Sequence, residues 1–172
     1  MNTMNLADTP GYYYAIAYWL SALLIVMQNK KRITSRGWWG VQLCFLIAIT
    51  VLMTVTANTD RIFFMPTMTL CIFLLFLQIY TCADFTPTVA GYYCARAFIC
   101  GEFTASLGWQ IYFYSVAGLH LKRSYLTSLL LIAVVYAVVF AVFWFLDTKQ
   151  SSDEVEIRIT RRECFSAIIL SA

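Results

Sequence analysis

Apolar residues in this chain are concentrated in five long stretches, and charged residues lie between them. The stretches cover about residues 11–27, 38–57, 62–82, 92–117 and 125–146. Each is close to the roughly 20 residues that a helix needs to cross a hydrocarbon layer roughly 30 Å thick. The pattern predicts an all-α, polytopic membrane helix bundle with five transmembrane helices, built as a single membrane domain over residues 1–172.

The pattern changes after the fifth stretch. Residues 147–163 form a polar run with nine charges, in which Val155, Ile157 and Ile159 alternate with polar residues. This alternation is typical of a short strand, and a solvated loop is the alternative. Apolar residues then resume at 164–172, enough for roughly 14 Å of helix. We expect this run to be the start of a sixth transmembrane helix of a longer protein; a terminal half-helix at the membrane interface is the alternative.

Composition agrees with a membrane protein. Hydrophobic residues make up 61% of the chain and charged residues only 12%, whereas a soluble domain has about 25% charged residues. Aromatic residues mark the ends of the stretches, where rings with a polar tip settle at the lipid headgroups. The lipid bilayer is therefore the first partner that the sequence predicts.

Basic residues are distributed unevenly among the connections. With the N-terminus outside and all five stretches spanning, eight bases lie in cytoplasmic connections and three in outer ones, Arg96 left aside. Because bases are retained on the cytoplasmic side, this count favours a protein of the cell membrane whose N-terminus is extracellular and whose 147–163 segment is cytoplasmic. If 92–117 only lies on the membrane surface, the counts become six and five and do not discriminate.

The fourth stretch presents two faces of different character. One is a ridge of small residues, which lets two membrane helices approach closely; it consists of Ala97, Gly101, Ala105 and Gly108. The other is a polar stripe at helical spacing, formed by Glu102, Ser106, Trp109 and Gln110. The ridge predicts packing against neighbouring membrane helices or a second copy of the chain. The stripe and the nearby Arg96 are candidates for signal or ligand contact.

Glu102 is the main anomaly, because an acidic group inside a span costs about 3 kcal/mol on insertion scales. Arg96 lies about 120° around the helix, so it is poorly placed as a partner. Gln42, Gln78 or a tyrosine hydroxyl on another span could bond it instead. Three interpretations stay open: Glu102 and Gln110 cross-link the bundle, they line a ligand or signal-coupling site, or they belong to a proton or ion pathway.

Few residues offer other chemistry. The six cysteines lack the spacing and histidine partners of a zinc site, and nothing predicts a disulfide framework; they are Cys44, Cys71, Cys82, Cys94, Cys100 and Cys164. His120, the only histidine, lies beside Lys122 and Arg123 in a connection. Phosphate-loop, nucleophile-elbow and zinc-protease motifs are absent, as is a basic groove interleaved with aromatics. We therefore expect no catalytic residues, metal or cofactor, and no nucleic-acid partner.

The stretch from Arg96 to Gln110 resembles a segment in the N-terminal membrane region of Gram-positive GHKL-type sensor histidine kinases, which are related to quorum-sensing receptor kinases. There the segment looks like R-A-F-x-x-x-E-F-x-A-S-L-x-W-Q, and Gly108 departs from it at a position where an acidic residue is expected. A second similarity is the run from Arg161 to Ile169, which looks like the start of the family's next membrane helix.

The resemblance implies a sensing module, in which an unknown extracellular signal shifts helix packing and biases a kinase. The phospho-accepting histidine and the ATP-binding domain of such kinases have no counterpart in residues 1–172, so we expect no enzyme activity from this chain. His120 does not correspond to the phosphoacceptor. Two other classes remain alternatives: a small multi-pass transporter or channel subunit, with Glu102 and Gln110 in its path, and a membrane assembly protein that binds through the small-residue ridge.

Overall fold

The computed structural model describes residues 10–33, 35–56, 64–118 and 125–152. Nearly all of these residues are helical, which confirms the all-α prediction. The five helices are α1 (Gly11–Gln28), α2 (Ser35–Thr56), α3 (Phe64–Cys82), α4 (Pro87–Ala117) and α5 (Tyr125–Ser152).

Two helix boundaries differ from the predicted stretches. α4 begins at Pro87 rather than near residue 92, because Thr86 is extended and the fixed φ of Pro87 suits the first helical turn. α5 continues six residues past 146, to Ser152, so the polar run begins as helix. The rest of 147–163, the run 164–172, Cys164 and His120 lie outside the described residues.

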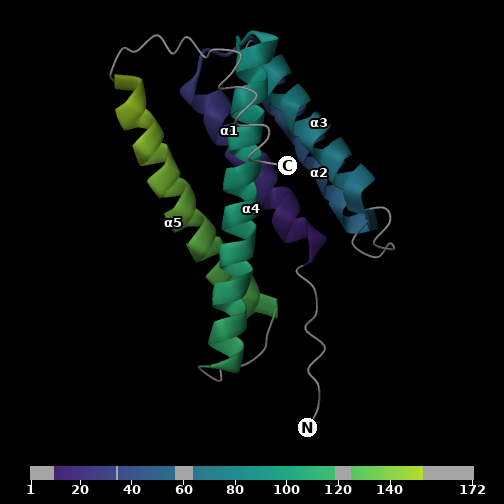
Figure 1. The fold of residues 1–172 in the computed structure, drawn as a ribbon, viewed down its shortest axis with the longest axis vertical. Coiled ribbons are helices and arrows are strands. Elements are labelled where there is room, and N and C mark those ends of the chain that lie inside the picture. The colour runs from purple at the N-terminus through teal and green to yellow at the C-terminus, as the bar shows by residue number, and fades with distance from the viewer. Residues whose placement is uncertain (1–9, 34, 57–63, 119–124, 153–172) are drawn as a thin grey trace.

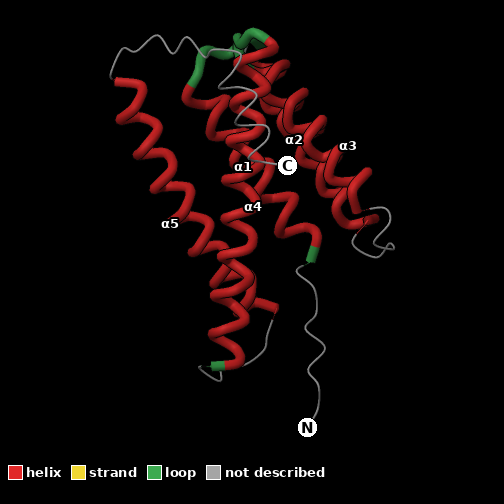
Figure 2. The backbone as a smooth tube through the Cα atoms, viewed as in Figure 1, coloured by secondary structure: helices red, strands yellow, loops and turns green. Residues whose placement is uncertain are grey.

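α1 lies in the middle of the bundle, with α2 and α3 on one side and α5 on the other (Figure 1). It contacts each of the other four helices, and nine of its 18 residues are buried. Successive helices run in alternating directions. The connections from α1 to α2 and from α3 to α4 therefore meet at one end of the bundle (Figure 2).

The core has two parts, one on each side of α1. Buried residues from α1, α2, α3 and the first half of α4 pack together in the larger part, around Tyr18, Ile49, Leu75 and Ile79. The smaller part joins α1 to α4 and α5, with Ala17, Ala105 and Tyr136 at its centre. α1 thus contributes buried residues to both clusters.

Three of the described helices are long and apolar enough to cross a membrane. Their candidate spans are Gly37–Val55 in α2, Met65–Cys82 in α3 and Leu126–Leu146 in α5. The sequence predicted five such spans, but α1 and α4 do not reach this level of apolarity. The reason is visible in their residues: α1 carries Tyr12, Tyr13, Tyr14 and Ser21, and α4 carries Arg96, Glu102 and Gln110.

Candidate functional site at the crossing of α1 and α4

α1 and α4 cross at Gly101, and the lack of a side chain there lets the two helices come very close. A Cβ atom on Gly101 would lie 2.6 Å from Tyr18 Cδ1, 3.1 Å from Tyr18 Cα and 3.2 Å from Tyr18 N. Two of these atoms belong to the backbone of α1, so they cannot turn aside. The absence of a side chain at Gly101 is what lets the two backbones approach here.

At this crossing Tyr18 meets Glu102. The Tyr18 hydroxyl donates a hydrogen bond to Glu102 Oε1, and the Tyr18 side chain is fully buried. The Tyr18 ring also stacks on Phe98 of α4, with 5.3 Å between centroids and 9° between planes. A carboxylate that is partly withdrawn from solvent is stabilised by a hydrogen-bond donor, and the Tyr18 hydroxyl is such a donor for the half-buried Glu102. Of the partners considered from sequence, a tyrosine hydroxyl is the one observed.

A second bond closes the crossing one turn further along α1. Ser21 Oγ lies 2.7 Å from the Ala97 carbonyl oxygen of α4 and 2.7 Å from the carbonyl oxygen of Tyr18. Ala97 is fully buried, and the lack of a larger side chain lets Ser21 reach the α4 backbone. We call Tyr18, Ser21, Ala97, Gly101 and Glu102 the α1–α4 crossing.

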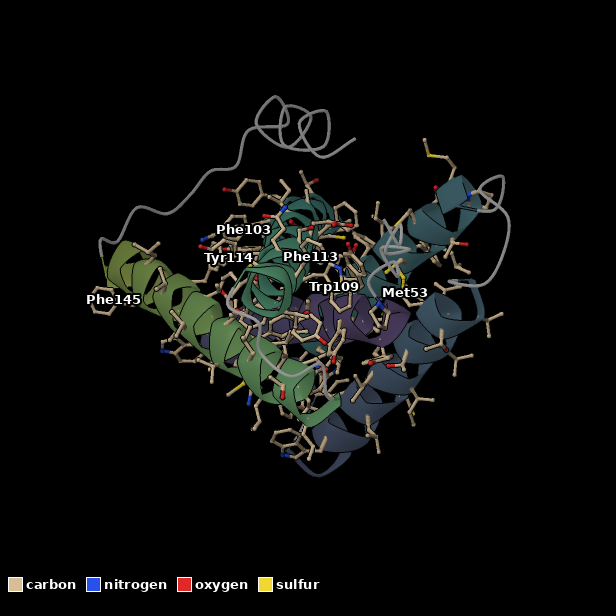
Figure 3. The ribbon with its side chains drawn as sticks, turned by 90° about the horizontal axis from the view of Figure 1, so that it is seen from below. Met53, Phe103, Trp109, Phe113, Tyr114 and Phe145 are labelled. Carbon is tan, nitrogen blue, oxygen red and sulfur yellow. The ribbon has the colours of Figure 1, made fainter. Side chains whose placement is uncertain are left out.

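The rest of the predicted polar stripe does not gather around Glu102. Trp109 packs instead against Tyr13 and Tyr112, at centroid distances of 6.2 and 5.3 Å. Gln110 is exposed and Ser106 is half-buried. Seen along the bundle, Trp109 lies on the side of α4 toward α1, whereas Phe103 and Tyr114 point away from it (Figure 3). The residues of the predicted polar stripe therefore have different surroundings and do not form one site.

The small-residue ridge is used within the chain, against two different helices. Ala97 and Gly101 face α1 at the crossing. Ala105 is buried in the smaller core cluster, and a Cβ atom on Gly108 would lie 3.1 Å from Tyr136 Cε1 of α5. In the structure, α1 and α5 are the helices that cover the ridge.

Further polar contacts tie α1 to the outer helices. Trp19 Nε1 donates to the Gln42 carbonyl oxygen at 2.9 Å, and Gln78 Nε2 donates to Gln42 Oε1 at 2.7 Å. Both glutamine side chains are fully buried. On the α5 side, the Tyr136 hydroxyl donates to the Tyr13 carbonyl oxygen at 2.9 Å. Gln42 and Gln78, considered from sequence as partners of Glu102, bond each other.

Arg96 is half-buried on α4, and the Tyr18 hydroxyl supplies a hydrogen bond to Glu102. Among the described residues, no group of three or more His, Cys, Asp and Glu side chains could hold a metal ion. The five cysteines in that part of the chain are free thiols, and four of them are buried. The polar contacts that the structure shows at this site are interhelical hydrogen bonds.

Sequence reasoning identified Glu102 and Gly101 but missed Tyr18 and Ser21. Tyr18 is one of four tyrosines near the start of α1, and the signal that separates it is spacing. Ser21, Ala22 and Ile25 follow Tyr18 at offsets of three, four and seven residues, and all four residues are buried. That periodicity would mark the face of α1 that packs against other helices.

Comparison with known proteins adds no relative to this description. No family model, curated protein or solved structure matches the chain. The class that the described structure defines is therefore an all-α helical protein with three candidate membrane spans, organised around a central helix.

Proposed function

We propose that this chain is the membrane sensor module of a bacterial two-component signalling kinase, multi-pass in the cell membrane. The single observation that carries the proposal is the hydrogen bond from Tyr18 to Glu102 at the α1–α4 crossing. It joins the central helix to the segment that resembles the membrane region of GHKL-type kinases. An extracellular signal is the proposed ligand, and the kinase is the proposed recipient of the response.

The proposed mechanism is an exchange of donors on Glu102. A signal that donates a hydrogen bond to this carboxylate competes with Tyr18, and α4 then shifts relative to α1. A ligand can move such an equilibrium only through contacts that differ between the two states. The half-buried position of Glu102 supports this role, because the group is partly accessible while Tyr18 is not.

We also propose five spans, with the N-terminus outside. In this arrangement α1 and α4 also cross the membrane, and the bonds of Tyr18 to Glu102 and of Ser21 to the Ala97 carbonyl oxygen satisfy polar groups at their crossing. Two contacts support the orientation. Lys31 pairs with Ala83, and Gln28 Nε2 donates to the Trp144 carbonyl oxygen at 3.4 Å. The first contact joins the α1–α2 connection to the α3–α4 connection, and the second brings the C-terminal half of α5 to the same end of the bundle, in agreement with the distribution that the basic residues favour.

The test is a chimera of the full chain with the cytoplasmic region of a GHKL-type histidine kinase, assayed for autophosphorylation in membrane vesicles. Tyr18→Phe removes the donor of the bond, and Glu102→Gln replaces the carboxylate acceptor with a neutral amide, whose oxygen accepts a weaker bond. We expect each to change basal autophosphorylation by about fivefold or more, because couplings of 1–3 kcal/mol correspond to such factors. Tyr112→Phe, which removes a hydroxyl from α4 away from the crossing, is the matched control and should leave the activity within about twofold.

An active chimera whose output ignores both Tyr18→Phe and Glu102→Gln would overturn the proposal. The same variants address the transporter alternative: loss of solute flux in vesicles upon Glu102→Gln would favour transport. The described geometry argues for the sensor, because Glu102 bonds Tyr18 while Gln110 is exposed, so the two do not line one path.

A further inference from the structure

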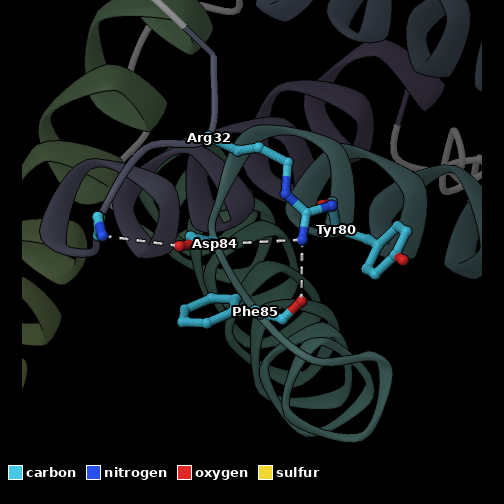
Figure 4. A network of polar contacts seen from close by, with 5 residues as sticks. Arg32, Tyr80, Asp84 and Phe85 are labelled. Atoms are coloured by element: carbon cyan, nitrogen blue, oxygen red, sulfur yellow. Dashed lines mark hydrogen bonds and ion pairs between the residues drawn. The ribbon is translucent and has the colours of Figure 1, made fainter.

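The connections at one end of the bundle are joined into a single unit. Lys31 and Ala83 form an antiparallel bridge, with Arg32 N donating to the Cys82 carbonyl oxygen at 3.0 Å and Asp84 N donating to the Lys30 carbonyl oxygen at 2.9 Å. We call Lys30, Lys31, Arg32 and Asp84 the basic platform. Figure 4 shows the contacts around Arg32 and Asp84.

Arg32 holds this platform together. Its guanidinium donates to the carbonyl oxygens of Tyr80 and Phe85 at 3.2 and 3.3 Å, and it lies 3.7 Å from Asp84 Oδ1 (Figure 4). It also lies over the Tyr80 ring, 5.0 Å from the centroid. A planar guanidinium with several donors suits this clamping role. Arg32 is thereby committed to contacts within the chain.

Lys30 and Lys31 differ from Arg32 in both exposure and partners. Lys30 Nζ lies 3.9 Å from Asp84 Oδ2, and its side chain is 86% exposed. An exposed ion pair of this length contributes little. Lys31 Nζ is also exposed and lies 4.2 Å from the centre of the buried Trp38 ring. The cation–π contact holds this ammonium in place, and its exposed side lets N–H donors bond other acceptors.

The position of the basic platform relative to a bilayer follows from the ends of two candidate spans. Ala83 directly follows Cys82, the last residue of the Met65–Cys82 span, and Trp38 is the second residue of the Gly37–Val55 span. The exposed Trp39 ring follows it. When these two helices cross a bilayer, both lysine ammonium groups lie at the level of the lipid headgroups, where tryptophan rings settle.

We propose that Lys30 and Lys31 bind the phosphate of an anionic phospholipid headgroup at this end of the bundle. Three cations and one carboxylate leave the platform with a net charge of +2, which is complementary to an anionic leaflet. Each base near such a surface adds to lipid attraction, and the effect is screened by salt. Arg32 and the backbone bridge supply the rigid frame on which the two ammonium groups are held. This proposal is independent of the sensor function.

The experiment measures lipid binding by native mass spectrometry of the purified full chain, with phosphatidylglycerol competing against phosphatidylcholine. Lys30→Gln/Lys31→Gln is the test variant. Lys122→Gln/Arg123→Gln, which removes the same two charges from the connection between α4 and α5, is the control. We expect the test variant to bind phosphatidylglycerol about tenfold more weakly and the control to match the wild type. Lys30→Arg/Lys31→Arg, which keeps the charges, should retain the preference.

Three outcomes would overturn the proposal. The first is a wild-type chain with no preference for phosphatidylglycerol, a result that does not depend on any variant folding. The second is equal loss in the test and control variants, which would indicate general charge attraction. The third is inorganic phosphate displacing bound phosphatidylglycerol completely, which would make free phosphate, not the lipid, the ligand.

Discussion

The central and the outer helices of this bundle differ in how their polar groups are accommodated. Half of the residues of α1 are buried, whereas only 22%, 33% and 22% of the candidate spans in α2, α3 and α5 are buried inside the protein. The outer helices present apolar side chains to their surroundings, among them Leu43, Phe73 and Leu130. The polar groups of α1 instead bond to α4, α2 and α5.

This difference explains why α2, α3 and α5 are apolar enough to be candidate membrane spans, whereas the central helix α1 is not. A helix that faces lipid on most sides must be apolar, because lipid offers no hydrogen-bond partners. A helix surrounded by other helices can carry tyrosine, serine and tryptophan, provided that each donor finds an acceptor. α1 meets this condition at Tyr18, Trp19 and Ser21.

The largest test of the comparison is a side chain added at the centre and at the periphery. Gly101→Leu places atoms against the Tyr18 backbone, so we expect the free energy of unfolding to fall by about 3 kcal/mol, at the upper end of overpacking effects. Gly40 on α2 is exposed, and a Cβ atom there meets nothing within 4 Å. Gly40→Leu should therefore change the free energy by less than about 0.5 kcal/mol. Reversible unfolding in mixed detergent micelles measures both.

Equal destabilisation by the two substitutions would break the comparison, since it would mean that α2 packs as tightly at Gly40 as α1 does at Gly101. A tolerated Gly101→Leu would place the crossing of α1 and α4 at another residue.

A smaller effect is expected where the outer helices carry buried polar groups of their own. Gln42→Leu leaves the buried amide of Gln78 without its partner and should cost about 1–2 kcal/mol. Replacing both residues by leucine removes the orphaned group, so the double variant should recover most of that loss in a double-mutant cycle. Gln110→Leu, the same change at an exposed position of α4, should be nearly neutral. Additive losses at Gln42 and Gln78 would show that the two amides do not act as a pair.

The helices could be predicted from sequence because each apolar stretch is long and bounded by charges. Four of the five predicted starts agree with the structure within about three residues. The exceptions have physical causes. Pro87 begins α4 early because proline suits a first turn, and α5 runs to Ser152 because a change to polar residues does not by itself end a helix. The polarity pattern locates an expected membrane border, whereas a helix end depends on local backbone signals.

The candidate site could be predicted only in part. Glu102 was identifiable because a carboxylate in an apolar stretch demands a partner, and the small residues around it were identifiable from their spacing. The identity of the donor was not, because several tyrosines in α1 could supply a hydroxyl. Periodicity also grouped Ser106, Trp109 and Gln110 with Glu102. Periodicity shows which residues share one face of a helix, but it does not show how far along that face a neighbouring helix extends. Gln110 lies on the same face as Glu102 but is exposed.

The smallest effect that sharpens the comparison lies between α1 and α5. Tyr136→Phe removes the hydrogen bond to the Tyr13 carbonyl oxygen but keeps the ring that packs against Gly108. The carbonyl still accepts a bond within its helix, so we expect a loss of only about 0.6 kcal/mol, the average for interhelical bonds in a membrane. Tyr18→Phe should cost more, because it leaves the carboxylate of Glu102 without its donor. The free energies of unfolding of the two tyrosine variants, measured under the same conditions, therefore compare how strongly α5 and α4 are each bonded to α1. A larger loss for Tyr136→Phe than for Tyr18→Phe would assign α5, not α4, as the helix most tightly coupled to α1.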